Sequence, residues 1–314
     1  MSTTTVEDPR VTVVVASRNR REELLSTLGR HRAPVVLVDN GSTDGTVEAV
    51  RREHPQVEVV SLPRNVGAQA RSIGVDRATT PFVAFADDDS WWSPGALAHG
   101  ATVLSTHSGV ALLNARILVG PAQRLDPVCE VMAQSPLPRR DLPGPAILGF
   151  VACAAMVRTD AFREAGGFDG VVRFPGEEER LSLDLAERSW HQVYLPDMVV
   201  HHHPSPMRHD AATRRRAMTR SSVLTAVLRL PVATVARRVG EAARADGATR
   251  RGLLDAVVDL PAALLHRRPV SSRVVHELEL VERGGSHAIP HTHPSAAMTA
   301  SSGTGADSHE KGHR

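Results

Sequence analysis

The chain has 314 residues, of which 41% are hydrophobic and 23% are charged, so it can form one large globular domain with an appendage. Its formal charge of +2 is close to neutral, which argues against a protein whose surface binds nucleic acid. Its two cysteines, Cys129 and Cys153, lack CxxC spacing, so both are expected to be free thiols of a reducing compartment.

The first ninety residues alternate short apolar runs with helical patterns. The runs rich in β-branched residues are 11–16, 34–38, 57–62 and 82–86. Each is followed by a polar loop and, in three cases, by helical spacing of apolar residues. The runs are continuously apolar, which is typical of strands buried on both faces of a parallel sheet. We therefore predict an α/β fold with a mostly parallel central sheet and flanking helices.

Beyond residue 89 the pattern is less regular. We expect one long strand or a strand pair at 110–119, a proline-rich mobile loop at 120–145, a strand at 150–157, an acidic helix opening at Gly176, and short strands at 193–195 and 198–200. The sequence therefore divides into a flexible N-terminus (1–9), an α/β domain (10–205), a helical appendage (206–284) and a disordered tail (285–314).

The appendage is rich in arginine and is expected to break at Pro231 and Pro261. Residues 208–283 contain fifteen Arg against eight Asp and Glu. Apolar residues recur at helical spacing through 222–268, so this segment suits a peripheral contact with an anionic membrane. A helical cap on the α/β domain or an oligomer contact fits the same pattern, and the oligomeric state stays open. Because the N-terminus lacks the apolar core of a signal peptide, we expect a cytoplasmic protein, with peripheral attachment to the inner face of the cell membrane as an open option.

Three consecutive carboxylates, Asp87, Asp88 and Asp89, directly follow the fourth apolar run. Side chains at the carboxyl ends of strands in an open α/β sheet point into the crevice where ligands bind. Clustered carboxylates repel one another unless a cation is present, and Mg²⁺ or Mn²⁺ prefers oxygen ligands. The triplet therefore predicts a divalent metal that in turn holds a diphosphate, although a solvated acidic turn is the alternative for such a triplet alone.

Other polar clusters fit a nucleotide-diphosphate ligand. Asp39 ends the second run and could accept the imide N–H of a pyrimidine, while Asn40 and Gly41 could present backbone N–H groups. Arg64 and Arg71 could meet phosphate charge. The sequence contains neither a G-x-G-x-x-G after the first run nor a G-x-x-x-x-G-K-[ST], so a dinucleotide-binding or P-loop protein is not supported.

Six segments in this order resemble family 2 glycosyltransferases with the GT-A fold. They are 38–46 (VDNGSTDGT), 64–67 (RNVG), 85–89 (FADDD), 165–169 (AGGFD), 176–179 (GEEE) and 194–203 (YLPDMVVHHH). The resemblance covers roughly residues 10–205 and implies inverting transfer of a sugar from a nucleotide-diphosphate donor to an acceptor hydroxyl. The acceptor is unknown, and a glycan or a lipid-linked molecule is the candidate. It implies these donor contacts: Ala16, Ser17, Arg18, Asn19, Asp39, Asn40, Gly41, Arg64, Asn65, Gly67, Arg71, Asp87 and Asp88.

The resemblance also implies roles for the acidic and histidine segments. Asp89 matches the direct metal ligand of the family's DXD motif, and Asp87 matches its contact to ribose or to metal-bound water. His202 aligns best with a metal-ligating histidine, with His201 and His203 as alternatives. Glu178 is the first choice for the base that deprotonates the acceptor, and Glu177 is the second.

Two departures from the family pattern keep other functions open. Glu178 stands where Asp is common, and Arg180 replaces an acid found in many members. The acidic turn 177–179 also fits a helix start stabilised by the helix dipole. The alternatives are a non-catalytic nucleotide- or partner-binding relative and a sugar-nucleotide pyrophosphorylase, although the latter's Gly-rich loop is not reproduced. Trp91 and Trp92 are each interpreted as a sugar platform or as core.

Overall fold

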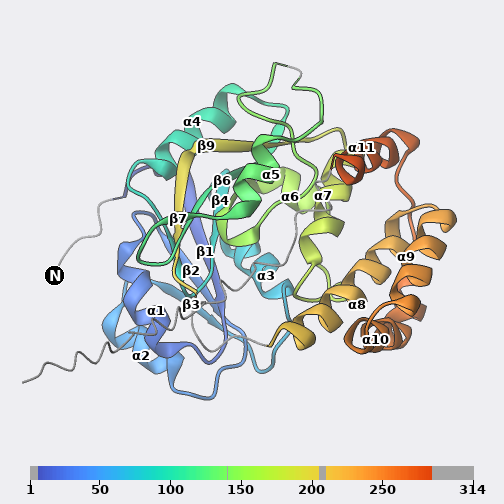
Figure 1. Ribbon diagram of the computed structural model, residues 1–314. Helices are drawn as coiled ribbons and strands as arrows, with labels where there is room; N and C mark the ends of the chain where they lie inside the picture. Colours follow the sequence, from blue (N-terminus) through green and yellow to red (C-terminus); the bar gives the residue numbers. More distant parts are fainter. Residues whose placement is uncertain (1–5, 140, 205–209, 285–314) are drawn as a thin grey trace, which may run out of the picture.

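A computed structural model of the chain describes residues 6–139, 141–204 and 210–284 (Figure 1). A nine-stranded mixed sheet runs through the molecule in the order β3-β2-β1-β4-β8-β6-β9-β5, with β7 paired to β6. The strands are β1 (Val11–Ser17), β2 (Val35–Asp39), β3 (Glu58–Ser61), β4 (Phe82–Ala86), β5 (Ser90–Trp92), β6 (Val110–Val119), β7 (Arg124–Leu125), β8 (Ala155–Arg158) and β9 (His191–His202).

The four strands predicted from the apolar runs are confirmed. β1 pairs in parallel with β2 and β4, and β2 pairs in parallel with β3. β1, β2 and β4 are buried along almost their whole length, as continuous apolar runs require. β3 lies at the sheet edge, and none of its residues is buried. Parallel pairing brings the carboxyl ends of β1, β2 and β4 to one edge of the sheet.

The second half of the sheet differs from the sequence expectation in two strands. β9 is one twelve-residue strand, whereas two short strands were predicted around Pro196. The β6–β9 register shifts between Ala115 and Arg116, whose partners are Leu195 and Val199, so Pro196 lies in an irregularity where it need not donate to the ladder. The strand expected at 150–157 begins only at Ala155, because 152–154 forms a 3₁₀ turn.

The proline-rich segment 120–145 is also more ordered than a mobile loop. It contains β7 and α5 (Pro127–Ala133). The Asp126 side chain caps α5 by accepting a hydrogen bond from the backbone N–H of Val128, with Pro127 at the first helical position. Cys129 and Met132 of this helix are buried in the core, so proline here starts a helix rather than preventing one.

Helices cover both faces of the sheet. The remaining helices of the α/β part are α1 (Arg21–Thr27), α2 (Thr46–Glu53), α3 (Gln69–Arg77), α4 (Ala96–Thr106), α6 (Thr159–Glu164) and α7 (Glu177–Glu187). One core contains alternate residues of β1 and β4 with apolar side chains of α1, α4 and α5. The other contains the intervening residues with side chains of α3, α6 and α7.

Four helices follow the sheet: α8 (Ala211–Arg229), α9 (Val232–Arg244), α10 (Gly247–Leu265) and α11 (Ser272–Arg283). They gather at one side of the molecule beyond α7 (Figure 1). Leu183 of α7 shares a buried cluster with Leu230 and with Leu278 of α11, so these helices pack on the α/β part. Pro231 separates α8 from α9 as predicted, but Pro261 lies inside a continuous α10, so that predicted break is wrong. No helix of the described residues is long and apolar enough to cross a bilayer.

The two ends of the chain lie partly outside the described residues. The terminus expected to be flexible lies outside them at residues 1–5, and the tail expected to be disordered, 285–314, lies wholly outside them. Within 6–9, the backbone N–H of Glu7 donates to the Arg32 carbonyl at 2.8 Å, and the Glu7 carboxylate accepts from the backbone N–H of Gly95 at 2.9 Å.

Gly74 sets how closely α3 approaches the sheet. A Cβ at this position would lie 2.4 Å from Cγ1 of Val14, a β-branched side chain with little freedom to move. We expect Gly74→Ala to lower the free energy of unfolding by about 1–3 kcal/mol, because overpacking outweighs the gain in helix propensity. Urea unfolding measures this, with Gly247→Ala as the control because its Cβ would meet open space. Equal losses in both variants would contradict the packing argument.

Candidate active site

Polar groups from several segments meet at the carboxyl-terminal edge of the parallel strands. Ser17, the last residue of β1, lies beside Asp39, the last residue of β2. The Ser17 hydroxyl donates to the Asp88 carboxylate at 2.8 Å, which connects the end of β1 with the loop after β4. Residues far apart in sequence therefore come together because three strands end at one edge.

Two loops at this edge are bound to each other through Asn40. Its side-chain amide donates to the Gly67 carbonyl at 3.0 Å and accepts from the backbone N–H of Val66 at 2.8 Å. Gly41 adopts φ +79°, and a Cβ there would lie 2.9 Å from the Arg64 backbone. Only glycine fits this close approach with a positive φ. Thus Asn40 and Gly41 join the loops that carry the DNGS and RNVG segments.

The loop after β1 joins the same assembly. The Asn19 side chain accepts from the backbone N–H of Thr43 at 2.8 Å, and its own backbone N–H donates to the Ser42 hydroxyl at 2.9 Å. Arg18 is exposed beside this loop, and its Nε lies 3.4 Å from the Gly41 carbonyl oxygen. Arg64 is exposed on the neighbouring loop, whereas Ala16 is half-buried. The loop residues named from the sequence therefore surround one edge of the sheet.

Asp39 is buried at this edge with one carboxylate oxygen left for a ligand. Its Oδ2 accepts from the backbone N–H of Ser42 at 3.1 Å. Its Oδ1 is buried and accepts no hydrogen bond within the described structure. A buried acceptor without a donor is costly, so an incoming N–H at this atom would be favourable.

The three aspartates contact different partners. Asp87 accepts from the Arg71 guanidinium at 2.6 Å, Asp88 accepts from Ser17, and an oxygen of Asp89 lies 3.3 Å from Nε2 of His202. Burial, followed by the charges of Asp89 and Asp87, raises the pKa of Asp88 to about 7. Each aspartate of the triplet therefore contacts a different side chain at the strand end, so the triplet is not a fully solvated turn.

Arg71 of α3 connects the triplet to the acidic helix α7. Its guanidinium contacts Asp87 on one side and lies 3.3 Å from Oε1 of Glu177 on the other. Burial by itself would lower the pKa of Arg71, but the two carboxylates outweigh it and raise that pKa, so the side chain stays charged. Arg71 was expected to meet phosphate, and the structure shows that its guanidinium also connects these two acids.

The N-terminus of α7 presents its acids toward this bridge. Gly176 precedes the helix with φ +104°, and Glu177 and Glu178 are both buried. Burial, followed by the neighbouring Glu178, raises the pKa of Glu177 to about 8. Oε2 of Glu177 accepts no hydrogen bond within the described structure. Near neutral pH, Glu177 is therefore protonated while it contacts the charged Arg71 side chain.

The three histidines separate as strand alternation predicts. Antiparallel pairing of β5 with β9 places Ser90 opposite His202, which brings the His202 ring to Asp89. His201 turns the other way, where Nε2 contacts the Ser93 hydroxyl at 2.7 Å and the ring stacks on Trp91. His203 also lies against Trp91, with ring centroids 4.7 Å apart.

The donor set suits a hard divalent cation. Asp89 supplies carboxylate oxygen, His202 supplies imidazole nitrogen, and Asp87 is on the same loop. Mg²⁺ and Mn²⁺ usually complete their coordination with water and substrate phosphates rather than with protein alone. Among the described residues, no three His, Cys, Asp or Glu side chains converge as a group that could hold a metal ion by themselves.

The structure shows which groups contact Trp91 and Trp92. Trp92 is buried and donates from Nε1 to the Phe85 carbonyl at 3.1 Å, which makes it core. The Trp91 ring is already contacted by His201 and by Arg30, whose Cζ lies 4.1 Å from the ring centroid. These contacts leave less of the ring for a sugar.

Arg180 is the residue whose role sequence reasoning missed. It is buried, lies 3.1 Å from the Asp169 carboxylate, and contacts Asp184 and the Gly167 carbonyl. It therefore ties α7 to the AGGFD segment. The i, i+4 spacing of Arg180 and Asp184 was the available signal for half of this arrangement.

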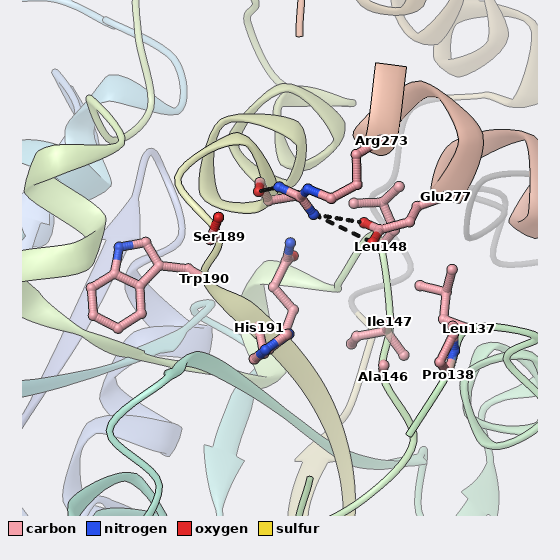
Figure 2. A pocket seen from close by; sticks show the side chains of 12 residues that line it. Leu137, Pro138, Ala146, Ile147, Leu148, Ser189, Trp190, His191, Arg273 and Glu277 are labelled. Carbon is pink, nitrogen blue, oxygen red and sulfur yellow. Dashed lines mark hydrogen bonds and ion pairs between the residues drawn. The ribbon is translucent and has the colours of Figure 1, made fainter. Parts of the chain in front are cut away.

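A separate hollow lies elsewhere, between α11 and the start of β9. It has a volume of 180 Å³ and is lined by side chains such as Trp190, His191 and Arg273. Figure 2 shows Arg273 pointing toward Glu277 across one wall, and the two form an ion pair at 3.3 Å. None of the site residues predicted from the sequence lines it, so the strand edge is the better candidate for the active site.

The raised pKa of Glu177 makes the stability depend on pH. Unfolded Glu177 loses its proton near 4.5 and folded Glu177 near 8, so its contribution to the free energy of unfolding falls as pH rises between these values. We expect Glu177→Gln to remove this part of the pH dependence. Urea unfolding with a chelator at pH 5.5 to 8.5 measures it, with exposed Glu48→Gln as control. Parallel curves for wild type and Glu177→Gln would contradict the assignment.

The sequence of this chain is similar to those of known glycosyltransferases. Residues 12–166 match the family described as Glycosyl transferase family 2. A pre-mycofactocin glycosyltransferase of Mycobacterium tuberculosis is 32% identical over 216 residues, covering 63% of this chain and 44% of the relative. The chain thus spans less than half the length of that relative. An N-acetylglucosaminyl-diphospho-decaprenol L-rhamnosyltransferase of the same species is 25% identical over 257 residues, covering 69% and 82%.

Solved structures agree on the fold. The structure of GalNAc-T7 with UDP, GalNAc and Mn²⁺ superposes with a TM-score of 0.60 at 15% identity, covering 89% of this chain and 58% of that chain. At this identity the likeness concerns the fold alone, and that fold is GT-A with the mixed sheet and flanking helices described above. Residues 12–166 thus match glycosyl transferase family 2 in sequence, and the two relatives and the GT-A architecture agree with that match.

Proposed function

We propose that this protein is an inverting, metal-dependent glycosyltransferase that moves a sugar from a nucleotide-diphosphate donor to an acceptor hydroxyl. The observation that carries the proposal is the Arg71 bridge. It holds Asp87 of the acid triplet and Glu177 of the acidic helix on one guanidinium, at 2.6 and 3.3 Å. The metal motif and the helix turn that carries both candidate bases are therefore connected by one side chain, and a single displacement requires such proximity.

The donor nucleoside binds, in this proposal, at the ends of β1 and β2. The Asp39 Oδ1 atom, buried and without a donor in the described structure, suits the imide N–H of a pyrimidine. The loops 16–19, 39–41 and 64–67 surround it and are bound together by Asn40 and Asn19. UDP in the related GalNAc-T7 structure is consistent with such a donor, and this chain's own base and sugar are open.

Asp89 and His202 would hold the metal, with Asp87 contacting metal-bound water or the donor ribose. When bound, Mg²⁺ or Mn²⁺ supplies Lewis-acid stabilisation of the negative charge on the leaving diphosphate. Oδ1 of Asp89 and Nε2 of His202 lie 3.3 Å apart, on the same side of the β5–β9 pair. Asp88 lies on the β1 side of the same loop through its contact with Ser17.

Glu178 is the proposed base that takes the proton from the acceptor hydroxyl. Glu177 is less suitable because Arg71 contacts it and because its raised pKa keeps it protonated near neutral pH. Glu177 instead orients the first turn of α7, so that its neighbour reaches the reacting oxygen. The acceptor is a hydroxyl of a glycan or a lipid-linked glycan, in keeping with the decaprenol-linked substrate in one relative's name. Two buried free cysteines support a cytoplasmic location.

Replacing the proposed base separates chemistry from donor binding. We expect Glu178→Gln to reduce transfer at least about a hundredfold, the usual contribution of general-base catalysis, while donor affinity stays near the wild-type value. Diphosphate release with a panel of nucleotide sugars and donor-induced thermal shift measure the two effects. The control is Glu130→Gln, on the exposed face of α5. Retained activity in Glu178→Gln would refute the base, and pyrophosphate as product would favour a pyrophosphorylase.

Metal dependence is tested at Asp89. We expect a chelator to abolish transfer and added Mn²⁺ to restore it, because the leaving diphosphate then lacks and regains its counter-charge. Asp89→Asn should weaken Mn²⁺ binding in the presence of UDP at least about tenfold, since it removes an anionic ligand. Titration calorimetry with MnCl₂ measures this loss, with Asp160→Asn on α6 as control. Transfer that persists in chelator would show that the reaction needs no metal.

A further inference from the structure

The outer face of α10 is an apolar stripe exposed to solvent. Between Arg251 and His266 every exposed residue of this helix is apolar. We call these residues the α10 stripe: Leu254, Val257, Val258, Pro261, Leu264 and Leu265. Their spacing places them on one face over about three turns. Val258 and Leu265 are each 80% exposed and Leu254 is 68% exposed, so the stripe is not covered by the described chain.

The acidic residues of α10 face the other way. Asp255 and Asp259 are the two acids between residues 250 and 268. Asp255 pairs with Arg216 of α8 at 2.5 Å, and Asp259 pairs with Arg220 of α8 at 2.5 Å. Gly252 lets α8 approach closely, because a Cβ there would lie 2.2 Å from the Arg216 carbonyl oxygen. The inward pairing leaves the outer face of α10 without negative charge.

Positive charge lies at both ends of the stripe. Arg250 and Arg251 precede it and Arg268 follows it, and all three are exposed. No carboxylate of the described chain forms an ion pair with Arg251 or Arg268. Arg267 differs, because its guanidinium donates inward to the Leu230 carbonyl at 2.8 Å. The outer face therefore combines exposed aliphatic side chains with basic ends.

We propose that the α10 stripe docks on an anionic lipid bilayer. Aliphatic side chains would enter the boundary between headgroups and acyl chains, and the arginines at both ends would contact lipid phosphates. Charge complementarity favours this occupant over a second copy of the chain. Pairing two stripes, parallel or antiparallel, brings basic ends against basic ends with no acid on either face, which costs energy by like-charge repulsion.

The structure also narrows the membrane contact suggested by the sequence over 222–268. The apolar residues Val223, Leu224 and Val227 of α8 are buried in the helical layer, so α8 has no apolar face to offer a bilayer. Among the described helices of this segment, α10 exposes five large apolar residues, whereas α9 exposes one, Val232. The surface is distinct from the strand edge, and its docking does not depend on the proposed transfer.

Vesicle flotation with the full chain tests the surface. We expect binding to phosphatidylcholine vesicles that contain phosphatidylglycerol, weaker binding to phosphatidylcholine alone, and loss of binding as salt is raised. The double variant Val258→Glu/Leu265→Glu should bind at least about tenfold more weakly, because charge at the stripe resists burial. Leu125→Glu on β7, also exposed, is the matched control and should bind like wild type.

A second variant distinguishes weaker membrane binding from a folding defect. Arg250→Gln/Arg251→Gln leaves the stripe intact and should weaken binding about tenfold at low salt while reducing its salt dependence. Wild type that stays unbound on the anionic vesicles overturns the proposal, as does equal binding by wild type and the stripe variant. A wild-type dimer in sedimentation velocity that the stripe variant converts to monomer, without vesicle binding, assigns the stripe to a second copy and overturns it as well.

Discussion

The buried ion pairs of Arg71 are the constraint on which the rest of the site depends. Two acidic side chains from different parts of the chain, the partly exposed Asp87 and the buried Glu177, end beside the same buried guanidinium. Removing the arginine would leave the Asp87 carboxylate without its counter-charge and the buried Oε1 of Glu177 without a hydrogen-bond donor, and both losses cost stability. The acid triplet and the acidic helix are therefore held at a fixed separation by a side chain that also cancels part of their charge.

Arginine side chains also form ion pairs with other acids at the start of α7. Arg238 of α9 pairs with Glu179 at 2.6 Å, while Arg180 pairs with Asp169 at 3.1 Å. Glu177 and Glu179 are thus each bound by an arginine from another helix, α3 and α9, and Glu178 lies between them in the first turn. The helical region after residue 210 contributes to the orientation of the acidic turn, and so it supports the site as well as packing beside it.

Arginine serves two physical purposes in the helical layer. Arg216 and Arg220 face α10 and pair with its acids, whereas Arg250, Arg251 and Arg268 are exposed. Internal pairing removes negative charge from the outer face of α10, so the local charge there is positive although the whole chain is nearly neutral. The distribution of charge, rather than its sum, decides which surface suits an anionic partner.

The sequence by itself determined the parallel strands, the polar loops at their ends, the acid triplet and the resemblance to family 2, because local apolar periodicity and contiguous motifs carry that information. It did not determine that β9 is continuous through Pro196 or that α5 forms within 120–145, since the neighbouring strand and buried core override local propensity. Tertiary structure alone decided that Arg71 bridges two acids, that His202 rather than His201 faces Asp89, and that α8 buries its apolar face while α10 exposes one. Helical spacing identifies an apolar face, but contacts between distant segments decide what covers it.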